Sequence, residues 1–162
     1  MDISRYLAKS GEKVDLTQWP TACDVDIDKK KVKEELLDQT ITEMQDLQEK
    51  LFADNHYGLV IVLQAMDAAG KDGTVKHVFA RLNPAGVKVQ SFKKPSSEEL
   101  DHDYMWRINK ALPGRGEIGI FNRSHYEEVV VARIHNLIKS DGMPEELVRK
   151  DIWESRYRQI RD

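Results

Sequence analysis

The chain contains a single cysteine, Cys23, in 162 residues, so no disulfide can form within it. Small secreted domains commonly depend on disulfides, and one thiol therefore favours a reducing compartment. No apolar run approaches the roughly 20 residues that cross a membrane as a helix. The first residues also lack the apolar core of a signal peptide. We therefore expect a cytoplasmic protein without a membrane partner.

Positive charge is not in excess either. The formal net charge is -3, from 25 Lys and Arg against 28 Asp and Glu. Proteins that bind nucleic acid through their overall charge are usually basic, so we expect no nucleic-acid partner. The five histidines do not have the spacing of a metal site. Hydrophobic residues make up 40% of the chain, which is ordinary for a soluble domain with one core.

The chain divides into an arm and a domain. Residues 1–28 show no apolar period and are predicted to form an irregular arm, and residues 29–162 form the domain. Near its start, apolar residues recur at steps of three and four: Leu37, Ile41, Met44, Leu47 and Leu51. This spacing places them on one face of a helix, and we expect that face to pack against the core.

Three short apolar segments follow, at residues 59–63, 87–92 and 117–121. Helical segments are predicted between them, at about 71–82 and 96–112, and more helix follows the third. This alternation is typical of a parallel sheet with helices on both faces. We therefore predict an α/β fold with three layers, α/β/α. The first segment, a continuous apolar run, is expected to be buried on both faces of the sheet.

Two of the predicted helices begin with a candidate capping box. Ser96 is followed three residues later by Glu99, and Ser124 is followed by Glu127. In a capping box the serine side chain accepts a hydrogen bond from the backbone of the third residue, and the glutamate reaches back. The spacing therefore predicts helix starts at both serines.

A candidate phosphate-binding loop follows the first strand and opens the next helix. Phosphate oxygens need several backbone N–H groups at one point, and a helix N-terminus provides them. Lys71 adds a mobile positive charge. The predicted phosphate-binding residues are Ala68, Ala69, Gly70, Lys71, Asp72, Gly73 and Thr74. The usual pattern has Gly at the position of Ala65 and Ser or Thr at that of Asp72, and a strand-to-helix turn without a ligand is the alternative.

Polar residues at the end of the third segment form a second candidate site. Because strands of this fold bind ligands at their carboxyl ends, Asn122 and Arg123 are expected beside the loop. An acidic residue often helps to hold Mg²⁺ at such a strand end, but here the residue is Asn122. Asp67, the only carboxylate inside the loop, is therefore the candidate Mg²⁺ ligand, with an Asx turn as the alternative. Arg123 could stabilise charge on a moving phosphoryl group or be an ordinary surface arginine.

Four segments in order resemble the type-2 polyphosphate kinases. They are residues 65–73, 91–96, 103–107 and 121–129, and the resemblance extends over about residues 30–160. The resemblance implies a P-loop (Walker A) kinase fold, Mg²⁺ as cofactor, and transfer of phosphoryl groups between polyphosphate and nucleotides (AMP, ADP or ATP). Asn122 is similar to the branch that phosphorylates nucleoside mono- and diphosphates.

The same resemblance implies roles for individual residues. Asp67, Lys71 and Arg123 are implied as active-site (catalytic) residues. Arg133 is implied as a phosphate-binding residue at the start of a lid over residues 133–162. Polyphosphate is a linear polyanion, so a groove of basic side chains is expected to hold it. The candidates, each of which could also be a solvated surface charge, are Lys76, Arg81, Lys93, Lys94, Arg107 and Arg133.

Two alternatives share the phosphate loop: an ATP-dependent nucleotide kinase of the same fold, and a non-catalytic truncated fragment that binds phosphate chains. No strand is predicted after Arg133, and the last residues, 153–162, lack a helix C-cap. We therefore expect a chain truncated after its third strand, within its lid. The P-loop kinase fold places the phosphate-loop strand centrally, so one of its edges should be unpaired and could drive homo-oligomer formation.

Overall fold

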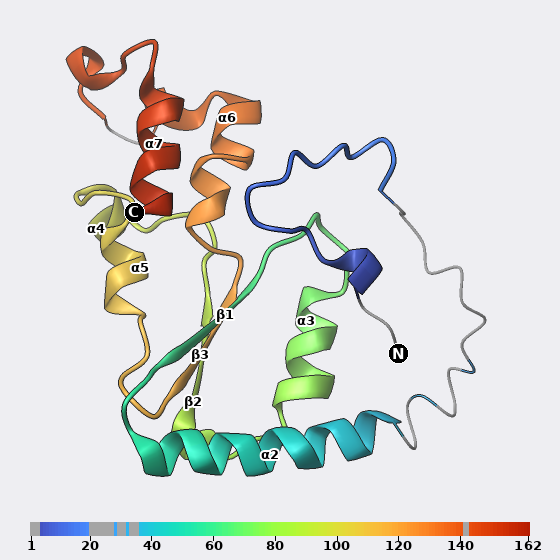
Figure 1. Ribbon diagram of the computed structural model, residues 1–162. Coiled ribbons are helices and arrows are strands. Elements are labelled where there is room, and N and C mark those ends of the chain that lie inside the picture. The colour runs from blue at the N-terminus through green and yellow to red at the C-terminus, as the bar shows by residue number, and fades with distance from the viewer. Residues whose placement is uncertain (1–3, 20–27, 29–31, 33–35, 141–142) are drawn as a thin grey trace.

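The fold is built on one parallel sheet of three strands. The computed structural model describes residues 4–19, 28, 32, 36–140 and 143–162 (Figure 1). The strands are β1 (Leu59–Leu63), β2 (Val87–Ser91) and β3 (Ile118–Asn122), in the order β1-β3-β2. Leu63 is level with Asn122, and Ser91 is level with Asn122 on the other side. The three carboxyl ends therefore meet in one row.

The central strand is β3, not the phosphate-loop strand β1. Ile118, Ile120 and Phe121 of β3 are at most 6% exposed. In β1, by contrast, the first two residues, Leu59 and Val60, are exposed. The prediction that residues 59–63 are buried on both faces is therefore wrong. Among the described residues β1 pairs on one side only, and no strand follows Arg133. The expected unpaired edge of the phosphate-loop strand is thus present, although that strand lies at the margin of the sheet.

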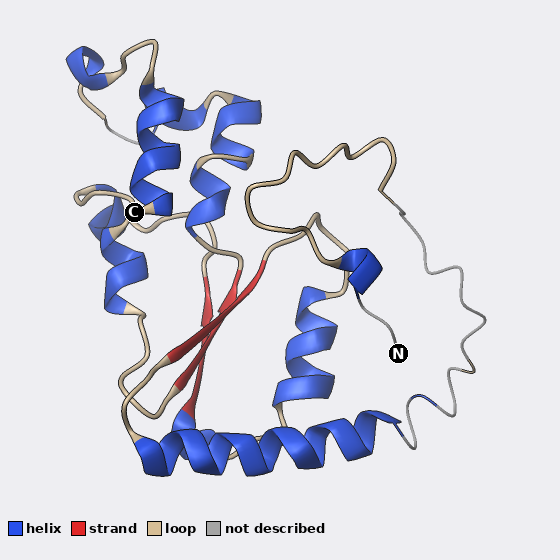
Figure 2. Ribbon diagram, in the orientation of Figure 1, coloured by secondary structure: helices blue, strands red, loops and turns tan. Residues whose placement is uncertain are grey.

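Helices cover both faces of the sheet and both of its ends. In Figure 1, α3 (Lys71–Thr74) lies on one side of the strands, and α4 (Ser97–Leu100) and α5 (Trp106–Lys110) lie on the other. The long helix α2 (Leu37–Asp54) runs past the amino ends of the strands, and α6 (Val131–His135) and α7 (Ile152–Arg161) lie beyond the carboxyl ends (Figure 2). The short helices are η1 (Ser4–Tyr6), η3 (Val75–Phe79), η4 (Pro84–Gly86), η5 (His125–Glu128), η6 (Leu137–Ser140) and η7 (Glu145–Leu147).

Two hydrophobic clusters, one on each face of β3, explain the three layers. Successive residues of a strand point to opposite faces. Ile118 and Ile120 pack with Phe79 from the α3 side. Phe121 packs with Phe92 and Ile108 from the α5 side, and its ring meets that of Phe92 edge-on at 4.9 Å. The predicted three-layer α/β/α architecture is confirmed.

One face of α2 packs on this core, but one predicted core residue does not. Ile41 is buried, and Met44 and Leu51 contact the first cluster, whereas Leu47 is 63% exposed. Gln48 is buried instead. Its side-chain amide donates to the Asn83 carbonyl and accepts from the Asn83 N–H, both at 2.8 Å. These two bonds satisfy a buried amide and fasten α2 to the loop before β2.

The helix predicted over residues 96–112 is divided into α4 and α5. The Asp103 carboxylate accepts from the Met105 N–H at 2.9 Å, a local bond that competes with helix continuation. The capping box of Ser96 and Glu99 forms as predicted. The one at Ser124 does not, because the Ser124 side chain accepts from the Tyr126 N–H and the segment is a 3-10 turn.

The arm is described only in part. Residues 4–19 contain η1 followed by turns, and their described side chains are almost all exposed. Residues 1–3 and 20–27 of the predicted arm, with Cys23, lie outside the described residues, as do 29–31 and 33–35 ahead of α2. In the part of the chain that the structure describes, no helix combines the length and apolarity needed to span a membrane.

Candidate phosphate-binding site

The loop between β1 and α3 turns sharply at two small residues. Gly70, which precedes the first residue of α3, has φ +91°, and Ala68 has φ +61°. Such backbone angles favour glycine, so Gly70 suits its position and Ala68 is strained. Ala65, where glycine is usual, is not among the residues with positive φ. Alanine at position 65 therefore brings no backbone strain of this kind.

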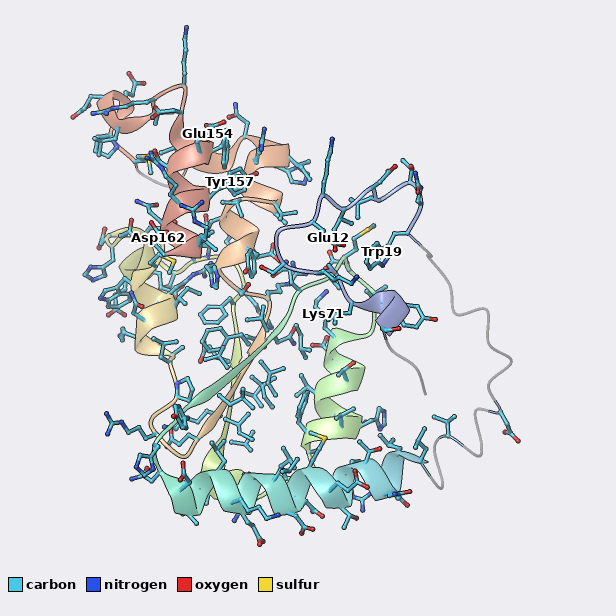
Figure 3. The ribbon with its side chains drawn as sticks, in the orientation of Figure 1. Glu12, Trp19, Lys71, Glu154, Tyr157 and Asp162 are labelled. Carbon is cyan, nitrogen blue, oxygen red and sulfur yellow. The ribbon has the colours of Figure 1, made fainter. Side chains whose placement is uncertain are left out.

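Lys71 is folded back over this loop. Its ammonium Nζ donates to the carbonyl oxygens of Ala65 and Met66, at 2.7 and 2.8 Å. Figure 3 shows Lys71 at the start of α3, near the row of strand ends. These two acceptors are neutral, so an anionic phosphate oxygen would be a stronger partner for the ammonium.

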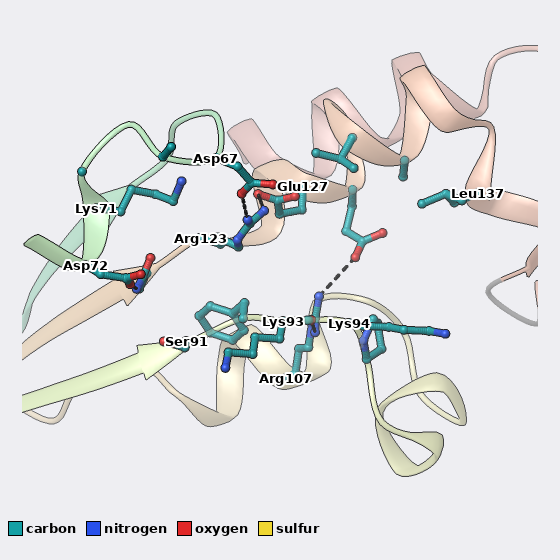
Figure 4. A pocket seen from close by; sticks show the side chains of 18 of the residues that line it. Asp67, Lys71, Asp72, Ser91, Lys93, Lys94, Arg107, Arg123, Glu127 and Leu137 are labelled. Atoms are coloured by element: carbon teal, nitrogen blue, oxygen red, sulfur yellow. Dashed lines mark hydrogen bonds and ion pairs between the residues drawn. The ribbon is translucent and has the colours of Figure 1, made fainter.

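Arg123 points back toward the loop. Its φ of +67° turns the chain at the end of β3, and its guanidinium contacts the carboxylates of Asp67 and Glu127, the latter at 3.2 Å (Figure 4). Partial burial opposes the charged form of Arg123, but attraction by Glu127 and then Asp67 outweighs it and raises the arginine's pKa. Arg123 therefore stays a cation throughout the ordinary pH range.

Glu127 and Gln64 hold this arrangement, and sequence reasoning did not assign either to the site. Gln64 donates to the Glu127 carboxylate at 2.6 Å and accepts from the hydroxyl of the fully buried Ser124 at 3.2 Å. The signal that could have found them is position, since Gln64 directly follows β1 and Glu127 lies four residues after Arg123. Together they connect the phosphate loop to the turn after β3.

Asp72, a departure from the usual loop pattern, contacts Asn122, which stands where an acidic residue is common at the strand end. The side-chain amide of Asn122, at the end of β3, donates to the Asp72 carboxylate in α3 at 2.5 Å. The strand end supplies the amide and the helix supplies the carboxylate. Asp67 and Asp72 are thus two aspartate carboxylates beside the phosphate loop, and Mg²⁺ is commonly bound by one or two carboxylates plus substrate phosphates. No group of three or more His, Cys, Asp or Glu with metal-binding geometry occurs among the described residues.

A cavity of about 1000 Å³ lies beyond the strand ends. The phosphate loop, the loop after β2 and the helices η5 and α6 surround it, and a space of this size can hold a nucleotide-sized ligand. Most of the predicted site residues line it: Asp67, Ala68, Gly70, Lys71, Asp72, Gly73, Lys93 and Arg123. Lys94 and Arg107, two of the groove candidates, also line it, across from Lys71 and Asp67 in Figure 4.

Other predicted residues lie outside this lining. Ala69 does not reach the cavity, and the Thr74 hydroxyl donates to the carbonyl of Gly70, the residue before α3. Arg133 donates to the Tyr157 hydroxyl at 2.7 Å, which holds α6 against α7. Arg81 pairs with Asp38 on α2, and Lys76 lies away from the cavity, so neither supports the predicted groove.

Comparisons with known proteins identify the family of the chain. The family model of Polyphosphate kinase 2 (PPK2) matches residues 26–159. The chain is 47% identical over 160 residues to an ADP-polyphosphate phosphotransferase of Rhodopseudomonas palustris, covering 98% of this chain and 55% of that protein. It is 46% identical over 119 residues to an AMP/ADP-polyphosphate phosphotransferase of Meiothermus ruber, covering 74% of this chain and 41% of that one.

A solved structure shows the same fold. The crystal structure of Polyphosphate Kinase 2 from Arthrobacter aurescens TC1 matches with a TM-score of 0.72 and 36% sequence identity, over 94% of this chain and 52% of that one. The chain thus spans about half the length of the relatives that it matches. From the family match and these relatives, the chain belongs to the polyphosphate kinase 2 family.

Proposed function

We propose that the protein transfers phosphoryl groups between inorganic polyphosphate and nucleoside mono- or diphosphates, with Mg²⁺, in the cytoplasm. The observation that carries the proposal is the cavity beyond the strand ends, which has a phosphate loop with Lys71 on one side and Lys93 and Lys94 on the other. Relatives named as polyphosphate phosphotransferases support it, and the single cysteine supports the location.

The residues of the site can do this chemistry without a covalent intermediate. Phosphoryl transfer needs positioned reactants and neutralised charge more than a nucleophilic side chain. The N–H groups at the start of α3 and the Lys71 ammonium would bind phosphate oxygens in place of the loop carbonyls. Arg123 would then face the moving phosphoryl group, after exchanging Asp67 for phosphate oxygens as its partner.

Asp67 and Asp72 are the residues that would hold Mg²⁺. Both line the cavity, and Asn122 orients the Asp72 carboxylate. Bound Mg²⁺ supplies charge neutralisation between neighbouring phosphates. Release of Arg123 from Asp67 would free that carboxylate for the metal, so the arginine and the carboxylate would be recruited together.

A donor assay tests the proposal. The chain is incubated with ADP or AMP and Mg²⁺, with long polyphosphate or ATP as donor, and the nucleotide products are separated. Polyphosphate-dependent product is expected. Product with ATP alone would favour the ATP-dependent kinase. Polyphosphate binding without product would favour a non-catalytic protein. Binding of long polyphosphate should also weaken more steeply with salt than binding of ADP, because more phosphates are neutralised at once.

Self-association is the further expectation for this chain. The outer edge of β1 is unpaired among the described residues, and Leu59 and Val60 are 46% and 36% exposed there. Unpaired N–H and C=O groups on an apolar strand invite pairing with another chain. Light scattering should therefore detect a homo-oligomer, and a stable monomer at high concentration would contradict the expectation.

A further inference from the structure

Three buried charged residues form a cluster in the wall of the cavity. Arg107 comes from α5, Glu128 from η5 and Arg156 from α7, and we name them the Glu128 cluster. Their side chains are 8%, 11% and 3% exposed. A charge at such depth is costly unless it is paired, so the contacts within the cluster determine where each of the three elements can lie.

The Glu128 carboxylate lies between the two guanidinium groups. Its Oε1 is 3.3 Å from Arg107 Nη2, and its Oε2 is 3.4 Å from Arg156 Nη1. Arg156 Nη1 also donates to the Glu128 backbone carbonyl at 2.8 Å. One side chain of η5 therefore joins α5 to α7, two helices that are far apart in the sequence.

Arg107 extends these contacts to the loop after β2. Its Nη1 donates to the Lys93 carbonyl at 2.8 Å and lies 3.6 Å from the Glu99 carboxylate. The same Glu99 carboxylate accepts from the Ser96 N–H at 2.8 Å. The segment from Lys93 to Ser96 is therefore fastened at both ends, and the exposed side chains of Lys93 and Lys94 project from a fixed backbone into the cavity.

The position of α7 depends on the same region. The Tyr104 hydroxyl donates to the Gln159 side chain at 2.9 Å, and the Arg156 guanidinium lies 4.8 Å from the centre of the Tyr104 ring. Beside these contacts, a second cavity of about 320 Å³ is lined by residues of α7, η7 and the loop before α5. Arg107 and Glu128 line both cavities, so the cluster forms part of the wall between them.

We propose that Glu128 and Arg156 are positioning residues for polyphosphate binding. When α7 packs as described, Arg156 fixes the position of the Glu128 carboxylate. Glu128 in turn fixes Arg107, and Arg107 holds the backbone of Lys93 and Lys94. Loss of the Arg156 contact lets the Lys93–Lys94 segment move, so the lysines meet fewer phosphates. The inference rests on the proposed function, because polyphosphate is the ligand that the lysine pair would bind.

The decisive experiment is a double-mutant cycle on polyphosphate affinity. Arg156→Met removes the guanidinium and keeps an aliphatic side chain. Arg158→Met is the matched control, since Arg158 lies on the same helix, is exposed, and donates to the Ser155 hydroxyl of its own helix at 3.3 Å. We expect Arg156→Met to weaken binding about tenfold, within the range typical of coupling between two sites, and the control to leave it unchanged. Arg156→Lys, which keeps the positive charge and a hydrogen-bond donor group, should restore part of the affinity.

The background with both lysines removed distinguishes positioning from general damage. In Lys93→Ala/Lys94→Ala, the added effect of Arg156→Met should fall to less than twofold, because the groups it positions are gone. An equal tenfold loss in both backgrounds would overturn the proposal, as would unchanged affinity in Arg156→Met. Melting temperatures of all variants show whether each one is folded at the assay temperature.

Amide hydrogen exchange gives a readout that needs no ligand. Arg156→Met should speed exchange in peptides that cover residues 92–98, as well as in α7, and Arg158→Met should not. Faster exchange in α7 alone would overturn the coupling. If the unaltered chain binds no polyphosphate, the proposed function fails, and this exchange measurement still decides whether α7 controls the lysine segment.

Discussion

The two sides of the cavity hold their charges in opposite ways. On the phosphate-loop side, Asp67 is 85% exposed, and Lys71 contacts only carbonyl groups of its own loop among the bonds in the described residues. On the other side, the Glu128 cluster is buried and each charge has a charged partner. Contacts of the first kind can be exchanged for phosphate at little cost, whereas contacts of the second kind are expensive to break. The difference indicates that the phosphate-loop contacts can give way to a ligand, whereas the Glu128 cluster maintains the shape of the wall from which Lys93 and Lys94 project.

The largest effect should come from removing the charge at the centre of the cluster. Glu128→Gln keeps the shape of the side chain but leaves two buried guanidinium groups without their shared partner. Breaking a buried ion pair in this way costs about 3–5 kcal/mol of stability. Urea unfolding measures it, with Glu98→Gln, on the exposed side of α4, as the control expected to change little. A loss below ~1 kcal/mol would show that the cluster is as loosely held as the phosphate loop.

On the phosphate-loop side, Lys71→Ala should reduce turnover and leave the fold intact. Loss of one preorganised group that stabilises transferring charge typically costs about 2.7–4 kcal/mol, or roughly 10²–10³ in rate. Its effect on the melting temperature should be small, because the lost bonds are to exposed loop carbonyls. Lys76→Ala, a change outside the cavity lining, serves as the matched control. Wild-type turnover in Lys71→Ala would disprove the phosphate-loop assignment.

Asp67→Asn should shift the Mg²⁺ requirement. The substitution removes one of the two aspartate carboxylates beside the phosphate loop, and we expect the Mg²⁺ concentration for half-maximal activity to rise roughly tenfold. Nucleotide affinity without metal should change less, since the loop N–H groups and Lys71 remain. Asp72→Asn tests the second carboxylate in the same titration. An unchanged Mg²⁺ titration in both variants would make the two carboxylates structural.

The smallest effect is expected at an exposed ion pair far from the cavity. Arg81 and Asp38 are about half exposed, and such pairs contribute about 0–1 kcal/mol. Arg81→Ala should therefore barely move the urea midpoint or the polyphosphate affinity. A clear loss of polyphosphate affinity would show that Arg81 belongs to the binding groove after all. The contrast between the two sides of the cavity would then no longer describe where the ligand binds.

Local patterns in the sequence predicted the strands well. The predicted segments 59–63, 87–92 and 117–121 differ from the observed strands by at most one residue at each end. Their order in the sheet was not predictable in the same way, because β1 has the most continuous apolar run and still lies at the margin. Burial depends on which strand the two helix layers enclose, and Ile118, Ile120 and Phe121 are enclosed on both faces.

The phosphate loop itself was also within reach of sequence, because its residues are neighbours in the chain, whereas the contact between Asp67 and Arg123 spans 56 residues. The Glu128 cluster was not, since its partners are 21 and 28 residues apart and no spacing rule relates them. Arg107 accordingly was predicted as a groove residue, and the structure adds that its guanidinium is committed to protein partners. Gln48 was missed for a similar reason, because its partner Asn83 lies 35 residues away.

The left-handed backbone at Arg123 affects which residues selection would favour at this position. Glycine would adopt φ +67° without strain, so Arg123→Gly should relieve the backbone at this turn. The same change would remove the guanidinium that faces Asp67. Selection for stability and selection for activity therefore oppose each other at this one position, and a variant library screened for thermal stability alone should accumulate glycine there. A library screened for phosphoryl transfer should retain arginine.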